Sequence, residues 1–401
     1  MTPASRPHVP SAGVAQPIVL RPAHTFWTMA RVGVAMLLHD RLKLLGILVG
    51  VTFAVVLSNQ QLATFGGLIH KNIMLAQHGG ADLWITPAST EQLVVGDLLS
   101  DSVMNVARTT PGVAWAAPLL LGAGTIKLPA GGSEQVQIVG VELPGLHGGP
   151  WNVVKGDPNG LAQADAMFFE DSDRERFGGL NLGSVREVNS HRVQAVGFTL
   201  GLVPFGPSYA FASFDTAREL THTDNHLENF VLVGLTPGTD QDRIAAQLQA
   251  ALPEQRVMTQ AEVERRTIRY LLRRTPIGVT FGTSALFGLI VGFVIVALTM
   301  FSAVIDHLRE FGTLKAIGAT NGDLTKLLVA QAIFCAVTGC LVGETLVSLM
   351  IRAISSPKLV MYLPPALMAG TFGVMIILCI CASGLALLRL RKLEPAMVFR
   401  S

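Results

Sequence analysis

Four long stretches of almost uncharged sequence constrain the fold of this chain more than any other feature. They cover residues 44–69, 275–305, 327–351 and 359–388, and only Glu344 interrupts them. A helix needs about 20 mostly apolar residues to cross the hydrocarbon core of a bilayer. Charged residues make up 14% of the chain, against roughly 25% in soluble proteins. We therefore predict four transmembrane helices rather than the buried helices of a large soluble protein.

The charges on either side of these stretches predict the topology. Basic residues predominate before the first stretch and after the last, which places both termini in the cytoplasm. Residues 70–274 then lie outside, with 16 basic and 22 acidic residues, while the remainder has 14 basic and 6 acidic residues. Five arginines between Arg265 and Arg274 oppose this orientation, although large domains can cross a membrane despite their charge. The net charge of +2 argues against a nucleic-acid partner.

The segment before the first stretch divides into two parts. Residues 1–23 are rich in Pro, Ala and Ser and are predicted to form a disordered cytoplasmic tail. In residues 24–43, Phe26, Ala30, Val34 and Leu37 recur at helical spacing. This pattern predicts an amphipathic helix on the inner membrane surface, or alternatively a simple extension of the first transmembrane helix.

The external segment alternates strand-like and helix-like patterns and predicts an α+β domain with a core of its own. Strands are expected at 81–86, 113–128 with a break, 135–141, 209–213 and 230–235. Helices are expected at 101–109, 215–221, 240–252 and 260–274. Residues 149–207 are dense in Gly and Pro and predict a small β-rich insertion. The fold class is therefore an α-helical membrane protein with four transmembrane helices and a large extracytoplasmic α+β domain between the first and second.

Motifs for catalysis, metal binding and nucleotide binding are absent from the sequence. There is no Gly-x-x-x-x-Gly-Lys loop, no His-Glu-x-x-His and no Gly-x-Ser-x-Gly. His222 and His226 have a spacing that could place them on one helix face, but the residues between them favour a solvated polar loop. We therefore predict no catalytic residues, no metal and no cofactor.

The short connection between the second and third stretches is more organised than a simple linker. In Asp306 to Asp323, DHLREFGTLKAIGATNGD, the apolar residues Leu308, Phe311, Leu314 and Ile317 recur every three positions. This spacing predicts an amphipathic helix at the membrane surface, of the kind that docks into a groove on a partner.

The run Arg309 to Ala319, REFGTLKAIGA, resembles the signature loop of the MacB/FtsX-like permeases of ABC transporters. The arrangement of one span, a large external domain, three spans and a basic tail is also similar, from about residue 24 to the end. The chain length and the ADLWITP stretch resemble the DevC-type branch. The family's usual fused ATPase is absent, which implies a separate nucleotide-binding subunit, as in DevC and FtsX.

The resemblance implies a dimer of permeases, each copy working with a separate ABC ATPase, and a periplasmic adaptor protein as a further partner. It implies contact with the ATPase through Arg309, Glu310, Phe311, Gly312, Leu314, Lys315, Ala316, Ile317 and Gly318. Replacing Phe311 and Leu314 by Asp is expected to uncouple ATP hydrolysis from transport while leaving folding intact. The implied location is a bacterial inner membrane.

Several residues inside the predicted spans are notable. The Glu344 carboxylate is costly in a membrane unless it is paired, hydrated or protonated, so it is either a coupling residue or hydrogen-bonded to a neighbouring helix, with help from Ser348. Three Gly-x-x-x-Gly pairs permit close helix packing and suggest a dimer seam through the second span. They are Gly278 with Gly282, Gly288 with Gly292, and Gly339 with Gly343.

The predicted segments are therefore 1–23, 24–43, 44–69, 70–274 with its insertion 149–207, 275–305, a cytoplasmic coupling loop at 306–326, 327–351, 359–388 and a cytoplasmic tail at 389–401.

Two functions from different classes remain open. One is export, or extraction of a lipophilic substrate from the outer face of the membrane, driven by the ATPase. The other is an FtsX-type regulator, whose external domain activates a cell-wall hydrolase without transport.

Overall fold

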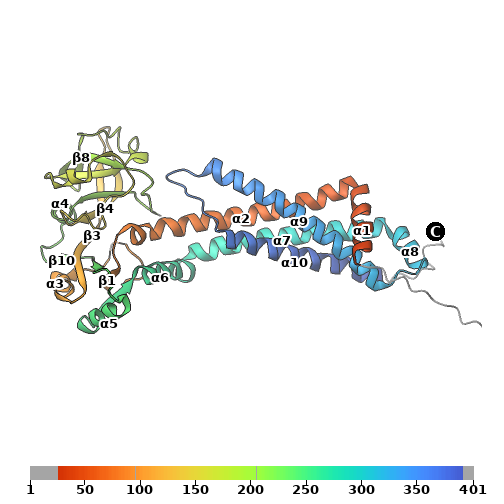
Figure 1. Cartoon of the computed structure of the whole chain (residues 1–401). Coiled ribbons are helices and arrows are strands. Elements are labelled where there is room, and N and C mark those ends of the chain that lie inside the picture. The colour runs from red at the N-terminus through yellow and green to blue at the C-terminus, as the bar shows by residue number, and fades with distance from the viewer. Residues whose placement is uncertain (1–25, 95, 205, 392–401) are drawn as a thin grey trace, which may run out of the picture.

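The computed structural model describes residues 26–94, 96–204 and 206–391, with side chains as far as Ala386. A bundle of long helices forms one end of an elongated molecule and an α+β domain forms the other (Figure 1). The predicted tail at 1–23 lies outside the described residues, as does the predicted tail at 389–401 apart from residues 389–391, which belong to the last helix. Within that part of the chain, four helices are long and apolar enough to cross a membrane: α2 (Arg41–His78), α7 (Pro276–Asp306), α9 (Asn321–Ile354) and α10 (Pro365–Arg391). The predicted fold class is confirmed.

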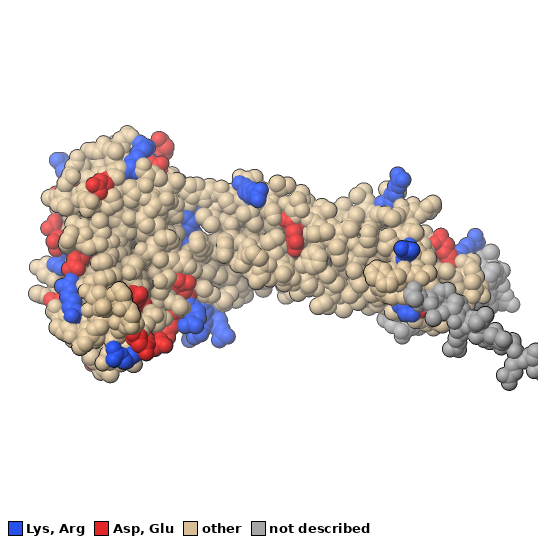
Figure 2. Space-filling view, in the orientation of Figure 1, with Lys and Arg blue, Asp and Glu red and all other residues tan. Residues whose placement is uncertain are grey.

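Figure 2 shows that charged side chains gather over the α+β domain and at the opposite end of the bundle, with few along its flank. This distribution is expected if the flank faces hydrocarbon, because charged groups are costly there. Large apolar side chains on the same helices are exposed, including Phe287, Leu298 and Ile377.

Helix α2 packs against α7 and α9 through small residues. A methyl group at Gly292 would overlap the Ala54 side chain, and one at Gly339 would overlap Val51. Gly288 and Gly343 likewise face α2, which leaves these four glycines in contacts within one chain. These four glycines therefore serve packing within one chain, and the predicted dimer seam through the second span stays a prediction.

The remaining pair differs from those four glycines. Gly278 lies against the backbone of Leu271 and Leu272, whereas no described atom lies within 4 Å of a methyl group placed at Gly282.

Helix α1 (Phe26–His39) lies across the end of the bundle (Figure 1). Asp40 separates it from α2 and accepts a hydrogen bond from the Lys43 backbone N–H, which caps α2. Gln331 of α9 donates to the Gly33 carbonyl at 2.8 Å and ties α1 to the bundle. Because of this break, α1 is not a simple extension of α2.

The extracytoplasmic domain is built on a mixed ten-stranded sheet with the order β12-β1-β11-β3-β4-β9-β6-β8-β5, in which β7 pairs with β3 and β8; β10 and β2 form a separate ladder. The strands are β1 (Leu83–Pro87), β2 (Leu99–Ser100), β3 (Val113–Lys127), β4 (Ser133–Val141), β5 (Val153–Gly156), β6 (Ala166–Glu170), β7 (Val185–Val188), β8 (His191–Thr199), β9 (Tyr209–Ser213), β10 (Leu227–Glu228), β11 (Phe230–Leu235) and β12 (Gln255–Thr259). The helices are α3 (Asp101–Thr109), η1 (Pro158–Ala162), η2 (Asp171–Asp173), α4 (Phe214–Thr221), α5 (Gln241–Ala251) and α6 (Gln260–Arg273).

One feature of this domain differs from the sequence-based expectation. Strand β3 runs from Val113 to Lys127 without a break, and its residues Leu119 to Lys127 pair continuously with β4. The strands within 149–207 belong to the main sheet, since β6 pairs with β9.

Both connections between this domain and the bundle are helical. Helix α2 continues beyond the apolar stretch, and its residues Met74 and Leu75 are buried in the core of the domain beside Trp84. Helix α6 contacts α2 and leads into α7 with only Arg274 and Thr275 between them. A displacement of α2 or α7 along its axis would therefore act directly on the sheet domain.

Candidate functional site

Helix α8 (Leu308–Ala316) occupies the turn between α7 and α9 at the end of the bundle that lies away from the sheet domain (Figure 1). It ends in a Schellman-type turn, with Ala319 N–H donating to the Leu314 carbonyl at 2.9 Å and Gly318 N–H to Lys315 at 3.0 Å. Gly318 has φ of 109°, which favours glycine there. A capping box between Thr320 and Asp323 then begins α9. The direction of α8 is therefore fixed at both ends.

One side of α8 packs into the bundle. Phe311 is only 3% exposed and belongs to the same core cluster as Leu37, Val304 and Leu324. Leu314 packs against this cluster and is partly buried. Phe311 therefore faces the bundle, and its burial argues against the expectation that replacing Phe311 and Leu314 by Asp leaves folding intact. The ATPase contact predicted through Phe311 stays a prediction.

The opposite side of α8 is exposed. We call it the outer face of α8, made up of Arg309, Glu310, Thr313, Ala316 and Ile317. Ile317 is 84% exposed. Gly312 is buried, Lys315 is half-buried and Gly318 is exposed. The signature sequence therefore supplies an inner face that anchors the helix and an outer face that remains open.

An ionic junction lies at the base of α8. Lys43 Nζ is 2.6 Å from Asp40 Oδ2 and 2.9 Å from Asp306 Oδ2, so it links the start of α2 to the end of α7. The hydrogen bond from Lys43 holds the pKa of Asp40 below its usual value. His307 Nδ1 lies 2.9 Å from Glu310 Oε1. Movement of α8 would thus reach α2 and α7 through ionic as well as apolar contacts.

The sequence matches two family models that together cover most of the chain. Residues 42–251 match the MacB-like periplasmic core domain, and residues 282–395 match the FtsX-like permease C-terminal model. The chain belongs to the MacB/FtsX-like permease family. The assignment to a DevC-type branch stays a prediction.

Solved structures similar to this permease are extracytoplasmic domains. The periplasmic region of MacB from Actinobacillus actinomycetemcomitans is 11% identical with a TM-score of 0.37, and the match covers 49% of this chain and 96% of that one. The extracellular domain of the ABC-type transporter YknZ from Gram-positive bacteria is 15% identical with a TM-score of 0.33, covering 45% of this chain and 99% of that one. No curated protein matches this chain significantly.

Glu344 of the permease is half-buried on α9. Ser348 Oγ donates to the Glu344 backbone carbonyl at 2.8 Å, so the expected help from Ser348 does not reach the carboxylate. Among the described residues, the structure gives this carboxylate no hydrogen-bond or ion-pair partner. A coupling role for Glu344 stays a prediction.

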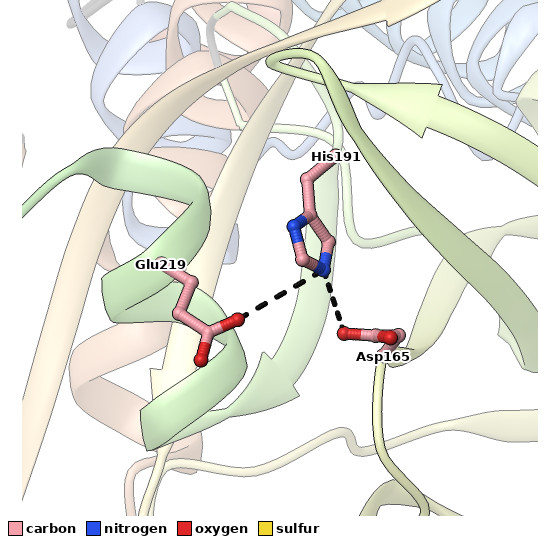
Figure 3. A group of neighbouring side chains, drawn as sticks. All are labelled: Asp165, His191 and Glu219. Atoms are coloured by element: carbon pink, nitrogen blue, oxygen red, sulfur yellow. Dashed lines mark hydrogen bonds and ion pairs between the residues drawn. The ribbon is translucent and has the colours of Figure 1, made fainter.

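Three side chains of the extracytoplasmic domain could hold a metal ion. His191 Nε2 lies 2.7 Å from Asp165 Oδ1 and 3.9 Å from Glu219 Oε2, and the three donor atoms lie within 4.8 Å of one another (Figure 3). A hydrogen bond and an ion pair explain this geometry without a ligand. The cluster therefore joins the start of β8 to α4 and to the loop before β6.

His222 and His226 do not come together as metal ligands. His222 caps α4 in a left-handed conformation, with φ of 52°. His226 Nδ1 instead lies 2.8 Å from Asp101 Oδ2, at the start of α3. The two histidines therefore serve separate structural contacts.

Proposed function

We propose that this protein is the permease subunit of an ABC transporter, in which a separate ATPase moves α8 and the bundle passes that motion to the extracytoplasmic domain. The observation that carries this proposal is the two-sided character of α8, with an anchored inner face and an exposed outer face. A helix that transmits force needs an exposed face for its partner and an anchored face for the bundle, because a loosely attached helix would move without moving its neighbours.

The transmission route follows from the packing. Phe311 attaches α8 to the core that it shares with α1, α7 and α9, and the Lys43 junction attaches its base to α2. Helix α2 has 38 residues and is therefore ~57 Å long at 1.5 Å per residue. Such a helix acts as a rod between the cytoplasmic face and the sheet domain.

The rest of the proposal concerns the surroundings of the permease. We place it in a bacterial inner membrane with both termini in the cytoplasm, as a homodimer that acts with two ATPase subunits and a periplasmic adaptor. Its substrate is a lipophilic molecule that is exported or extracted from the outer face. Family membership and the many exposed apolar side chains of the bundle support this assignment.

Ile317→Asp tests the ATPase contact. Loss of a side chain that acts as a hot spot at an interface costs about 2 kcal/mol or more, roughly 30-fold in affinity. We expect the variant to fold normally, to bind the ATPase at least 10-fold more weakly and to lose stimulation of ATP hydrolysis. The measurement is ATPase affinity and turnover with the permease reconstituted in vesicles.

The matched control is Leu182→Asp, an equally drastic change at an exposed apolar residue of the extracytoplasmic domain. It should leave ATPase binding unchanged. Unchanged ATPase binding by Ile317→Asp would contradict the proposed docking site. Coupled ATP hydrolysis without any movement of a lipophilic substrate would favour the FtsX-type regulator over a transporter.

A further inference from the structure

A cavity of about 390 Å³ opens at the outer end of the bundle, where the sheet domain meets α2 and α7. Its apolar lining includes Leu68, Val203, Ile277, Phe281, Leu359 and Val360. The loop between α9 and α10 closes one side, because Tyr362 N–H donates to the Ala63 carbonyl at 2.9 Å and the Val360 carbonyl rests against Gly67. This volume lies within the range of about 300–1,000 Å³ that is typical of small-molecule sites.

Lys71 sits at the polar end of this cavity and is 6% exposed. Its Nζ donates to the carbonyls of Gly201 and Pro357, each at 2.6 Å. An ammonium group has three donors, so one remains after these two bonds. None of the ion pairs among the described residues includes Lys71, whereas the neighbouring Lys358 is paired with the buried Asp173 at 2.7 Å.

A second cavity of about 490 Å³ also has Lys71 in its lining. Its lining includes His70, His78, Trp151, Asn152 and Leu202, together with Lys71 and Val360, which it shares with the first cavity. The buried lysine thus stands between an apolar cavity and a more polar one. That order matches an amphiphile with its tail on one side and its headgroup on the other.

The depth of Lys71 agrees with such a ligand. Lys71 follows Lys43 by 28 positions on the same helix, a distance of about 42 Å at 1.5 Å per residue. The hydrocarbon core is about 30 Å thick and the bilayer with its headgroups about 40–45 Å. With Lys43 at the inner surface, Lys71 lies at the level of the outer headgroups.

We propose that this cavity binds an anionic amphiphile from the outer leaflet, with its acyl chain against Phe281 and Leu68 and its acidic headgroup at Lys71. The inference rests on the proposed function and names the substrate class of the permease. Charge complementarity decides the headgroup. The two hydrogen-bond acceptors of Lys71 are carbonyls, and the buried carboxylate of Glu170 acts on it without an ion pair, so the remaining donor of the ammonium favours an anion over a zwitterion.

The test measures binding of fluorescent lysophosphatidylglycerol and lysophosphatidylcholine to the full-length permease in detergent, without ATPase or ATP. The wild-type protein should prefer the anionic lipid. Lys71→Gln should weaken its binding about 10-fold without affecting the zwitterionic lipid, and Lys71→Arg should retain the preference. Lys155→Gln, at a half-exposed lysine of the same domain, should change nothing.

A second variant tests the tail site independently of Lys71. Thr280, near the start of α7, lines the cavity and is not buried, so Thr280→Trp should fill the cavity and abolish binding of the labelled lipid. Inorganic phosphate at millimolar concentration should not compete, because it has no acyl chain.

Equal affinity for the two lipids, or unchanged binding by Thr280→Trp, would overturn the inference. A disulfide between copies that carry Lys71→Cys, with no lipid bound, would overturn it as well by assigning this face to the second copy. These outcomes can be distinguished from failure of the proposed function. If the lipid does not bind but the permease still couples to the ATPase, only the inference about the ligand is wrong. If the lipid binds but the ATPase does not contact the permease, only the proposed coupling role is wrong.

Discussion

Phe311→Asp should prevent the permease from folding into a stable bundle. Phe311 is 3% exposed among apolar side chains from α1, α7 and α9. Truncating a buried Phe costs about 3–5 kcal/mol, and a buried carboxylate without a partner adds to that loss. A destabilisation of at least about 4 kcal/mol is a large part of the stability of an ordinary domain.

The measurement is the yield of monodisperse protein in detergent and its thermal unfolding midpoint. Ile317→Asp is the control, since it places the same carboxylate six residues away on an exposed position. It should give wild-type yield and midpoint. If Phe311→Asp purified and melted like the wild type, the inward packing of α8 through Phe311 would be wrong.

This pair of residues illustrates what periodicity can predict. The spacing of Leu308, Phe311, Leu314 and Ile317 predicts one apolar face, and Phe311 and Leu314 do pack inward. Ile317 does not, because the helix ends at Ala316 and Gly318 turns the chain back. Periodicity describes a regular helix and gives no orientation beyond its last turn.

The four apolar helices were predictable because membrane insertion depends on local composition. Strand β12 was not, since Gln255–Thr259 contains few apolar residues and becomes a strand only by pairing with β1. Pairing between distant segments is a tertiary effect that outweighs local preference.

The burial of Lys71 could not be predicted either, because it also depends on contacts between distant segments. Its hydrogen-bond acceptors, Gly201 and Pro357, lie 130 and 286 residues away in the sequence. Lys71 follows a long apolar stretch, where a lysine is ordinarily taken as a helix end exposed at the membrane surface. Lys71 is buried only because α2 packs in the folded protein against the two loops that contain Gly201 and Pro357.

Glu228 is a second buried titratable group, in the extracytoplasmic domain. It is 2% exposed on β10, and its Oε1 atom has no hydrogen-bond partner among the described residues. Burial raises the pKa of Glu228 to about 8, with a contribution from the negative charges of Asp101 and Glu142. The three carboxyl groups line one cavity of about 330 Å³.

The stability of the permease should therefore fall as the pH rises. In the unfolded chain Glu228 ionises near the ordinary glutamate pKa of 4.5, whereas in the folded protein it holds its proton until about pH 8. Because the folded state binds this proton more tightly, its stabilising contribution is complete below pH 4.5 and is lost as the pH rises through 8. The loss is a few kcal/mol at most, at about 1.4 kcal/mol per unit of pKa.

Glu228→Gln should remove this dependence. The variant has no ionisable group at the site, so its thermal unfolding midpoint should equal or exceed that of the wild type at pH 9, where the wild type must ionise a buried carboxyl. At pH 5 the two midpoints should be similar. Scanning calorimetry of the full-length protein in detergent between pH 5 and 9 measures both.

Glu187→Gln is the matched control, because Glu187 is 40% exposed and pairs with Lys127 on the surface. It should leave the pH profile of the wild type unchanged, since a surface ion pair contributes little. If the difference between Glu228→Gln and the wild type were the same at pH 5 and pH 9, the Glu228 carboxyl would not be protonated in the folded domain. The positive charges of Arg108 and Arg218, which lower the pKa of Glu228, would then outweigh the effect of its burial.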